Sequence, residues 1–284
     1  MRPKIWLGAI LLTLMPFLAA AQDQHELLVQ ELYVKSGLAK QIQDIPRSIQ
    51  AGLDQELLEE EQFAKPSPRV IALMKALAPK AFAPEKLKAV VLPELKTGLT
   101  TSDLQAALKW LDSPLGIKCT RLEDEASTPE AYPEIDKYKA HLKKSPPTPE
   151  RLKIIHKLDA ALKATQTSVE MALNLQVALL LAVNATLPEE QQESPAEILD
   201  DIKQHRPEIE SALQLESLVS LFYTYRSLTE AEINQYIKFA TSSAGSKYQE
   251  VADAAMKKAL IAGGIRWGEA IGEAMKQLEG QTEA

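Results

Sequence analysis

The chain has 284 residues, of which 45% are hydrophobic and 5% aromatic, and its formal net charge is −7. This apolar share is enough for a packed core, whereas the acidic balance argues against nucleic acid or an anionic membrane as the main partner. The single cysteine, Cys119, excludes an intrachain disulfide framework, and we expect it to be a buried, inert thiol. Helix formers dominate and few segments alternate with period two, so the sequence predicts an all-α protein.

Residues 1–21 have the order of a secretory signal peptide. Arg2 and Lys4 precede an apolar run that ends in three alanines, and we predict cleavage after Ala21. The alternative is a membrane anchor, but the run is shorter than the roughly 20 residues that a spanning helix needs. We therefore expect a periplasmic or secreted protein without an integral membrane span after cleavage. Cleavage removes two basic residues, which brings the net charge to −9.

Two segments of 20 residues repeat one another. Residues 99–118 read LTTSDLQAALKWLDSPLGIK, and residues 228–247 read LTEAEINQYIKFATSSAGSK. Aligned without gaps, they are identical at six of the 20 positions: Leu99/Leu228, Thr100/Thr229, Lys109/Lys238, Ser113/Ser242, Gly116/Gly245 and Lys118/Lys247. Polar, apolar and small positions coincide along the whole segment, which indicates an internal repeat.

Each copy has the signals of a capped helix. Thr100 and Thr229 are N-cap candidates, and an acidic residue follows three positions later, Asp103 in one copy and Glu232 in the other. This is the spacing of a capping box, in which the cap and the acid satisfy each other's backbone N–H groups. We therefore expect a helix of about three turns to begin at each threonine.

A second cap follows each of these helices. Ser113 with Pro114 has the pattern of an N-cap followed by proline at the first helical position, and Ser242 repeats the cap without the proline. Gly116 and Gly245 then fall in the first turn of the next helix, where glycine costs about 1 kcal/mol relative to alanine. We interpret them as sites of close helix approach, which predicts two helix–turn–helix hairpins.

Lysines recur at two positions of the repeat, Lys109/Lys238 and Lys118/Lys247. They could hold an anion. The more common role of a repeated lysine on a short hairpin is to cover apolar surface with its aliphatic stem.

The hairpins end two larger stretches of helical pattern. We predict two diverged tandem helical units, residues 22–127 and 151–280, each ending in a helix–turn–helix hairpin. Residues 128–150 between them contain many prolines and charges, which is typical of a linker, with room for a short helix around 134–143.

The repeated pattern resembles the signature of a group of secreted bacterial helical proteins, classified as domain of unknown function 2059. The residues that carry the resemblance are Trp110, Ser113, Gly116 and Lys118 in the first copy and Phe239, Ser242, Gly245 and Lys247 in the second. The second copy departs from the signature because it lacks the proline. The resemblance implies an all-helical, exported protein and implies no activity.

Motifs of catalysis are missing from the sequence. The four histidines have no second ligand at metal-binding spacing, and no HExxH, CxxC, GxSxG, GxGxxG or phosphate-binding loop occurs. The acidic runs at 59–61 and 189–193 are typical of solvated helix faces. We therefore expect no catalytic residue, no metal and no cofactor.

One apolar stretch, residues 169–183, is broken by polar residues and is too short to span a bilayer. It is typical of a central core helix. The alternatives are the wall of an apolar ligand groove or a partner surface.

Glycines form a row near the C-terminus: Gly264, Gly268 and Gly272. Three glycines in one helix cost on the order of 2–3 kcal/mol, which close helix–helix contact can offset. We expect that contact to lie within the chain, with self-association or partner docking as alternatives. Charged neighbours argue against a membrane-embedded dimer.

Together these features favour an exported, non-enzymatic interaction or binding protein of the bacterial cell envelope, whose partner is an unknown protein or a second copy of the chain. The first alternative is a carrier of a small apolar ligand, with the 169–183 helix at its pocket. The second is an uncharacterised hydrolase whose carboxylates come from separate helices.

Overall fold

The computed structural model describes residues 15–59, 68–184, 187 and 189–280. Within these ranges every regular element is a helix, so the predicted all-α class is confirmed. The elements are α1 (Met15–Lys35), α2 (Leu38–Glu59), α3 (Pro68–Ala81), α4 (Pro84–Gly98), α5 (Thr101–Leu111), α6 (Pro114–Ala126), η1 (Pro129–Ala131), α7 (Tyr132–Lys144), α8 (Pro149–Leu162), α9 (Ala164–Asn184), η2 (Glu189–Gln191), α10 (Pro195–Thr224), α11 (Glu230–Ala240) and α12 (Ser243–Gly280).

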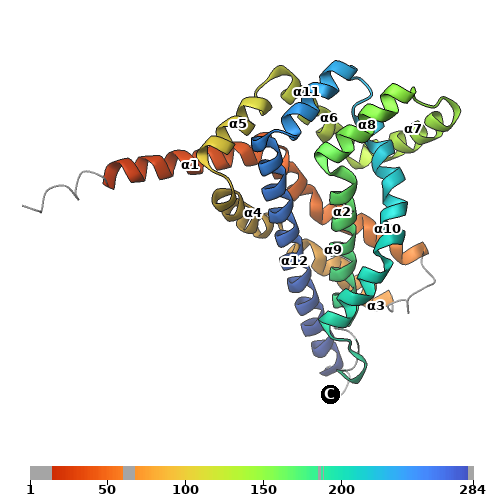
Figure 1. The fold of residues 1–284 in the computed structure, drawn as a ribbon. Coiled ribbons are helices and arrows are strands. Elements are labelled where there is room, and N and C mark those ends of the chain that lie inside the picture. The colour runs from red at the N-terminus through yellow and green to blue at the C-terminus, as the bar shows by residue number, and fades with distance from the viewer. Residues whose placement is uncertain (1–14, 60–67, 185–186, 188, 281–284) are drawn as a thin grey trace, which may run out of the picture.

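Figure 1 shows two groups of helices after the N-terminal helices α1–α4. The short helices α5, α6, α7, α8 and α11 gather at the top of the view, and α9, α10 and α12 run downward from them. The last helix, α12, makes its most extensive contacts with α9 and α4 and also packs on α3 and α5. The C-terminal helix therefore lies at the centre of the fold.

The largest hydrophobic core is built by α1–α5 together with α12. Val251, Ala255, Ala259, Trp267 and Ile271 of α12 are buried in it among side chains from the first hundred residues of the chain. This core draws on both predicted units, 22–127 and 151–280. The division into units stays a prediction.

Glycine allows α12 to approach its neighbours closely. A Cβ on Gly98 would lie 2.6 Å from Cγ1 of Val251, and a Cβ on Gly263 would lie 2.5 Å from the ring of Phe82. The same ring meets Trp267 edge to face at 5.8 Å, and the indole N–H of Trp267 donates to the carbonyl of Met74 at 3.0 Å. A fully buried tryptophan thus has its polar atom satisfied, as burial requires.

The apolar segment 169–183 forms most of α9, which packs between α10 and α12. Val169 and Leu173 join Ile198 and Ile202 of α10 in a separate small core. Among the described side chains of this segment, Val169 and Leu173 are buried and Met171 is 44% exposed, so the segment lies partly in the core. The groove described below does not involve α9.

The predicted glycine row falls in the second half of α12. Gly264 and Gly268 are buried and Gly272 is half-buried. By helical periodicity they continue the stripe of Asp253 and Lys257, whose side chains bond to α9 at Thr167 Oγ1 and Glu170 Oε2. The close helix contact expected of this row stays a prediction.

The predicted linker, 128–150, contains η1 and the whole of α7. Of the predicted signal peptide, residues 1–14 lie outside the described residues, and the predicted cleavage position after Ala21 falls within α1.

Among the described helices, none is both long enough and apolar enough to cross a bilayer.

Because Trp267 of α12 is fully buried and bonded to α3, we expect its substitution to change the free energy of unfolding strongly. We expect Trp267→Ala to lower the free energy of unfolding by about 3–5 kcal/mol, because it empties a fully enclosed site. Trp267→Phe keeps the ring contact and loses the hydrogen bond, so its effect is expected to be about 1–2 kcal/mol. Urea unfolding followed by circular dichroism measures both, and a cost below about 1 kcal/mol for Trp267→Ala would contradict this account of the core.

Candidate binding groove at the paired hairpins

Both copies of the repeat begin with a complete capping box. In the first, the backbone N–H of Asp103 donates to Thr100 Oγ1 at 3.2 Å, and the N–H of Thr100 donates to Asp103 Oδ2 at 3.0 Å. The corresponding distances for Glu232 and Thr229 are 3.2 and 2.7 Å. The shorter aspartate therefore completes the same motif as the glutamate.

The corner after each helix is also built in the same way. Ser113 Oγ donates to the carbonyl of Trp110 at 2.6 Å and accepts from the N–H of Gly116 at 3.0 Å. At Ser242 the two distances are 2.6 and 3.1 Å. One hydroxyl thus links the last turn of one helix to the first turn of the next, which satisfies backbone groups that both termini leave open.

The glycine of each corner is required by a backbone contact. A Cβ on Gly116 would lie 2.0 Å from the carbonyl oxygen of Trp110, and a Cβ on Gly245 would lie 2.1 Å from that of Phe239. No side chain fits at such distances. The close approach of the two helices therefore offsets the cost of placing a glycine in the first turn of a helix.

The two corners pack on each other through equivalent residues. The rings of Trp110 and Phe239, which occupy the same position in the repeat, stack at 4.7 Å with an angle of 9° between their planes. Tyr236 stacks on Trp110 at 5.4 Å. Like positions that meet each other are the mark of an isologous, two-fold contact, here formed within one chain.

The lysine at the end of each copy faces the capping acid of the other. Lys118 Nζ donates to Glu232 Oε1 at 2.7 Å, and this bond, with those from Thr229, lowers the pKa of Glu232 to about 2. Hydrogen bonds from Thr100 lower the pKa of Asp103, and the charge of Lys247 lowers it further. Lys118 and Lys247 therefore act on carboxylates of this chain.

Sequence reasoning missed a half-buried carboxylate, Glu123, that is bonded by two tyrosines. Tyr225 and Tyr236 both donate their hydroxyls to Oε1 of Glu123, at 2.7 and 2.8 Å. Burial raises the pKa of Glu123, against the effect of these two hydrogen bonds. Cys119 lies in the same core, and burial raises the pKa of its thiol to about 12, which fits the expected inert thiol.

Arg151 positions one of these tyrosines. Its guanidinium donates to the carbonyls of Leu228 at 2.9 Å and Tyr225 at 2.6 Å, so it holds the turn between α10 and α11. The sequence offered no signal for this cluster, because more than 100 residues separate Glu123 from the nearer tyrosine.

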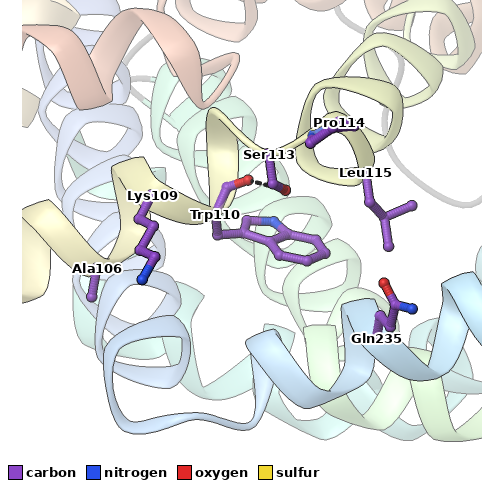
Figure 2. A pocket seen from close by; sticks show the side chains of 7 residues that line it. All are labelled: Ala106, Lys109, Trp110, Ser113, Pro114, Leu115 and Gln235. Carbon is purple, nitrogen blue, oxygen red and sulfur yellow. Dashed lines mark hydrogen bonds between the residues drawn. The ribbon is translucent and has the colours of Figure 1, made fainter.

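An open groove of about 540 Å³ lies beside the first corner. It is lined by Ala106, Lys109, Trp110, Ser113, Pro114, Leu115 and Gln235. Figure 2 shows the Trp110 indole across the middle, with Lys109 on one side and Leu115 and Gln235 on the other. Two signature residues, Trp110 and Ser113, thus line the groove, whereas Gly116 and Lys118 serve the corner and the pairing contact.

The chemistry of the lining is that of recognition. Its surface is mainly apolar, with one cation at Lys109 and one amide at Gln235. The Ser113 hydroxyl is engaged on both sides by backbone groups, and no histidine, cysteine or carboxylate lines the groove. In the described part of the chain, no cluster of three or more histidine, cysteine or acidic side chains is placed to hold a metal ion.

In comparisons with family models, curated proteins and solved structures, nothing matches this chain.

The corner geometry predicts that Gly116→Ala is destabilising although alanine is the better helix former. We expect a loss of about 1–3 kcal/mol, because the added methyl group forces Gly116 and the carbonyl of Trp110 apart. Pro114→Ala, beside it, is the control and should cost under about 1 kcal/mol, because it changes only the rigidity of the unfolded chain. Urea unfolding measures both, and equal effects would refute the steric account.

The carboxylate of Glu123 predicts a pH dependence with a defined sign. Burial raises the pKa of Glu123 in the folded protein above the ordinary value of 4.5. As pH rises above 4.5, the unfolded chain loses this proton first, so stability falls until the folded carboxyl also ionises. We therefore expect the stability of wild type relative to Glu123→Gln to decline with rising pH in this range.

Denaturant unfolding of both proteins across that range measures the difference. Glu125→Gln, an exposed acid on the same helix, controls for the removal of one carboxyl group. A difference between wild type and Glu123→Gln that stays constant with pH would contradict the prediction.

Proposed function

We propose that this chain is an exported, non-enzymatic binding protein of the bacterial cell envelope, and that the groove at the α5–α6 corner is its binding site. The observation that carries the proposal is an open, apolar groove with the indole of Trp110 across it and a lysine at its rim. Aromatic and apolar surface with a few polar groups is the usual composition of a recognition site.

The shape of the groove favours a segment of a partner protein over a small molecule. Small-molecule sites enclose most of the ligand surface, whereas this groove is open along one side. The lining fits a partner segment that has an apolar side chain next to an acidic group, because the apolar surface can contact the first and Lys109 at the rim can pair with the second. The volume of about 540 Å³ supports the carrier alternative to a lesser extent, and no lining residue supports the hydrolase alternative.

The proposal includes an origin by duplication, with two diverged tandem units that each end in a hairpin. The matching caps, the matching glycine contacts and the stacking of Trp110 on Phe239 support it. We also propose membership of the group classified as domain of unknown function 2059, on the signature residues of the two corners. Export rests on the order of residues 1–21.

Site-specific crosslinking in the producing cells tests the binding proposal. A photoreactive residue at Leu115, in the groove, should capture one discrete protein partner, whereas the same residue at exposed Ile117, outside the lining, should not. The captured partner is then purified and titrated against the protein. We expect Ala106→Trp, which fills the groove from an exposed position, to weaken its affinity about tenfold or more, through lost apolar contact.

Unchanged affinity in Ala106→Trp would contradict the groove as the site. Release of a small apolar molecule from the purified wild type, but not from Ala106→Trp, would instead favour the carrier.

A further inference from the structure

One region of the chain, residues 137–163, is basic although the net charge of the whole chain is acidic. Residues 137–163 contain eight lysines and arginines and two acidic residues, whereas the whole chain carries −7. This region comprises most of α7 and all of α8, which are joined by residues 145–148. Because the connection is short, the end of α7 and the start of α8 lie together, at the upper right of Figure 1.

Part of this basic charge is used within the protein. Lys137 pairs with Glu134, and Lys139 pairs with Glu216. The guanidinium of Arg151 donates to backbone carbonyls. These groups are partly neutralised or occupied, so they contribute little to an outward-facing surface.

Of the five remaining lysines, Lys163 lies at the far end of α8, and the other four are exposed and unpaired. Lys143 and Lys144 lie in the last turn of α7, and Lys153 and Lys157 lie one turn apart on the exposed face of α8. None of the four has an ion-pair partner among the described residues. Leu152, beside them on α8, is 40% exposed. We name these four lysines together with Leu152 the basic edge.

We propose that the basic edge docks onto the anionic lipid headgroups of a bilayer. Lysine is depleted at protein–protein interfaces, where its hydrated, flexible ammonium group is costly to fix. A layer of lipid phosphates does not require the ammonium groups to be fixed, because its negative surface potential attracts the charges without holding each side chain in one position. An exposed leucine among the lysines suits the boundary between headgroups and acyl chains.

Vesicle co-sedimentation of the purified protein tests this proposal. At low salt, we expect wild type to bind vesicles of equal parts phosphatidylglycerol and phosphatidylcholine, to bind phosphatidylcholine alone far less, and to be released by high salt. Lys143→Gln/Lys144→Gln and Lys153→Gln/Lys157→Gln should each weaken partitioning about 30-fold. The control is Lys80→Gln/Lys86→Gln, which removes two exposed lysines near the α3–α4 connection and should bind as wild type does.

Three results would overturn the proposal: equal binding to both vesicle types, an equal loss in the control, or release by soluble glycerol phosphate at a matched phosphate concentration. The last result would assign the lysines to a free phosphate ligand. Circular dichroism melts of each double variant confirm folding, and the two pairs lie on different helices, so misfolding of one leaves the other as a test. Ala106→Trp should bind vesicles normally, which separates this proposal from the groove.

Discussion

The fold depends on the contact between the two corners, where the ring of Trp110 stacks on that of Phe239. The two rings pack against different cores. Trp110 packs with the cluster that contains Cys119 and Ile233, and Phe239 packs with the cluster that contains Leu104. The contact therefore fixes the directions of α6 and α12, the helices that leave the two corners, and α12 then closes the main core.

Aromatic burial outweighs the ion pair in the energy of this contact. Stacked rings contribute about 0.5–1.5 kcal/mol beyond their area. Trp110 and Phe239 are both half-buried, so each adds part of the roughly 1.5–3 kcal/mol that full burial of a large side chain contributes. The pair of Lys118 and Glu232 is about one-third exposed, so its net contribution is about 0–1 kcal/mol. The charges instead specify register, because a one-turn slip would leave the capping carboxylate without its lysine.

Local sequence signals predicted the helices and their caps, because Thr100, Ser113 and Gly116 act on backbone groups within a few residues. Contacts between distant segments left no such signal. The path of α12 through the core of the first hundred residues and the bonds of two tyrosines to Glu123 are properties of tertiary packing. Net charge is a sum over the whole chain, so the value of −7 does not show that exposed lysines occur together on α7 and α8. The groove was missed as well, because Gln235 reaches it from the other copy of the repeat.

Comparison of the two copies within this one chain separates positions that build the corner from positions that are free to change. Serine, glycine and the last lysine are the same in both copies, and each makes a contact that the corner or the pairing requires. The groove is lined mostly by positions that differ: Pro114 and Leu115 correspond to Ser243 and Ala244, and Ala106 corresponds to Gln235. If these residues were the same in both copies, the two-fold contact would create two similar grooves, one at each corner. Their divergence gives the first corner an apolar lining whose residues are not repeated at the second corner, which is why the binding proposal is placed at the first.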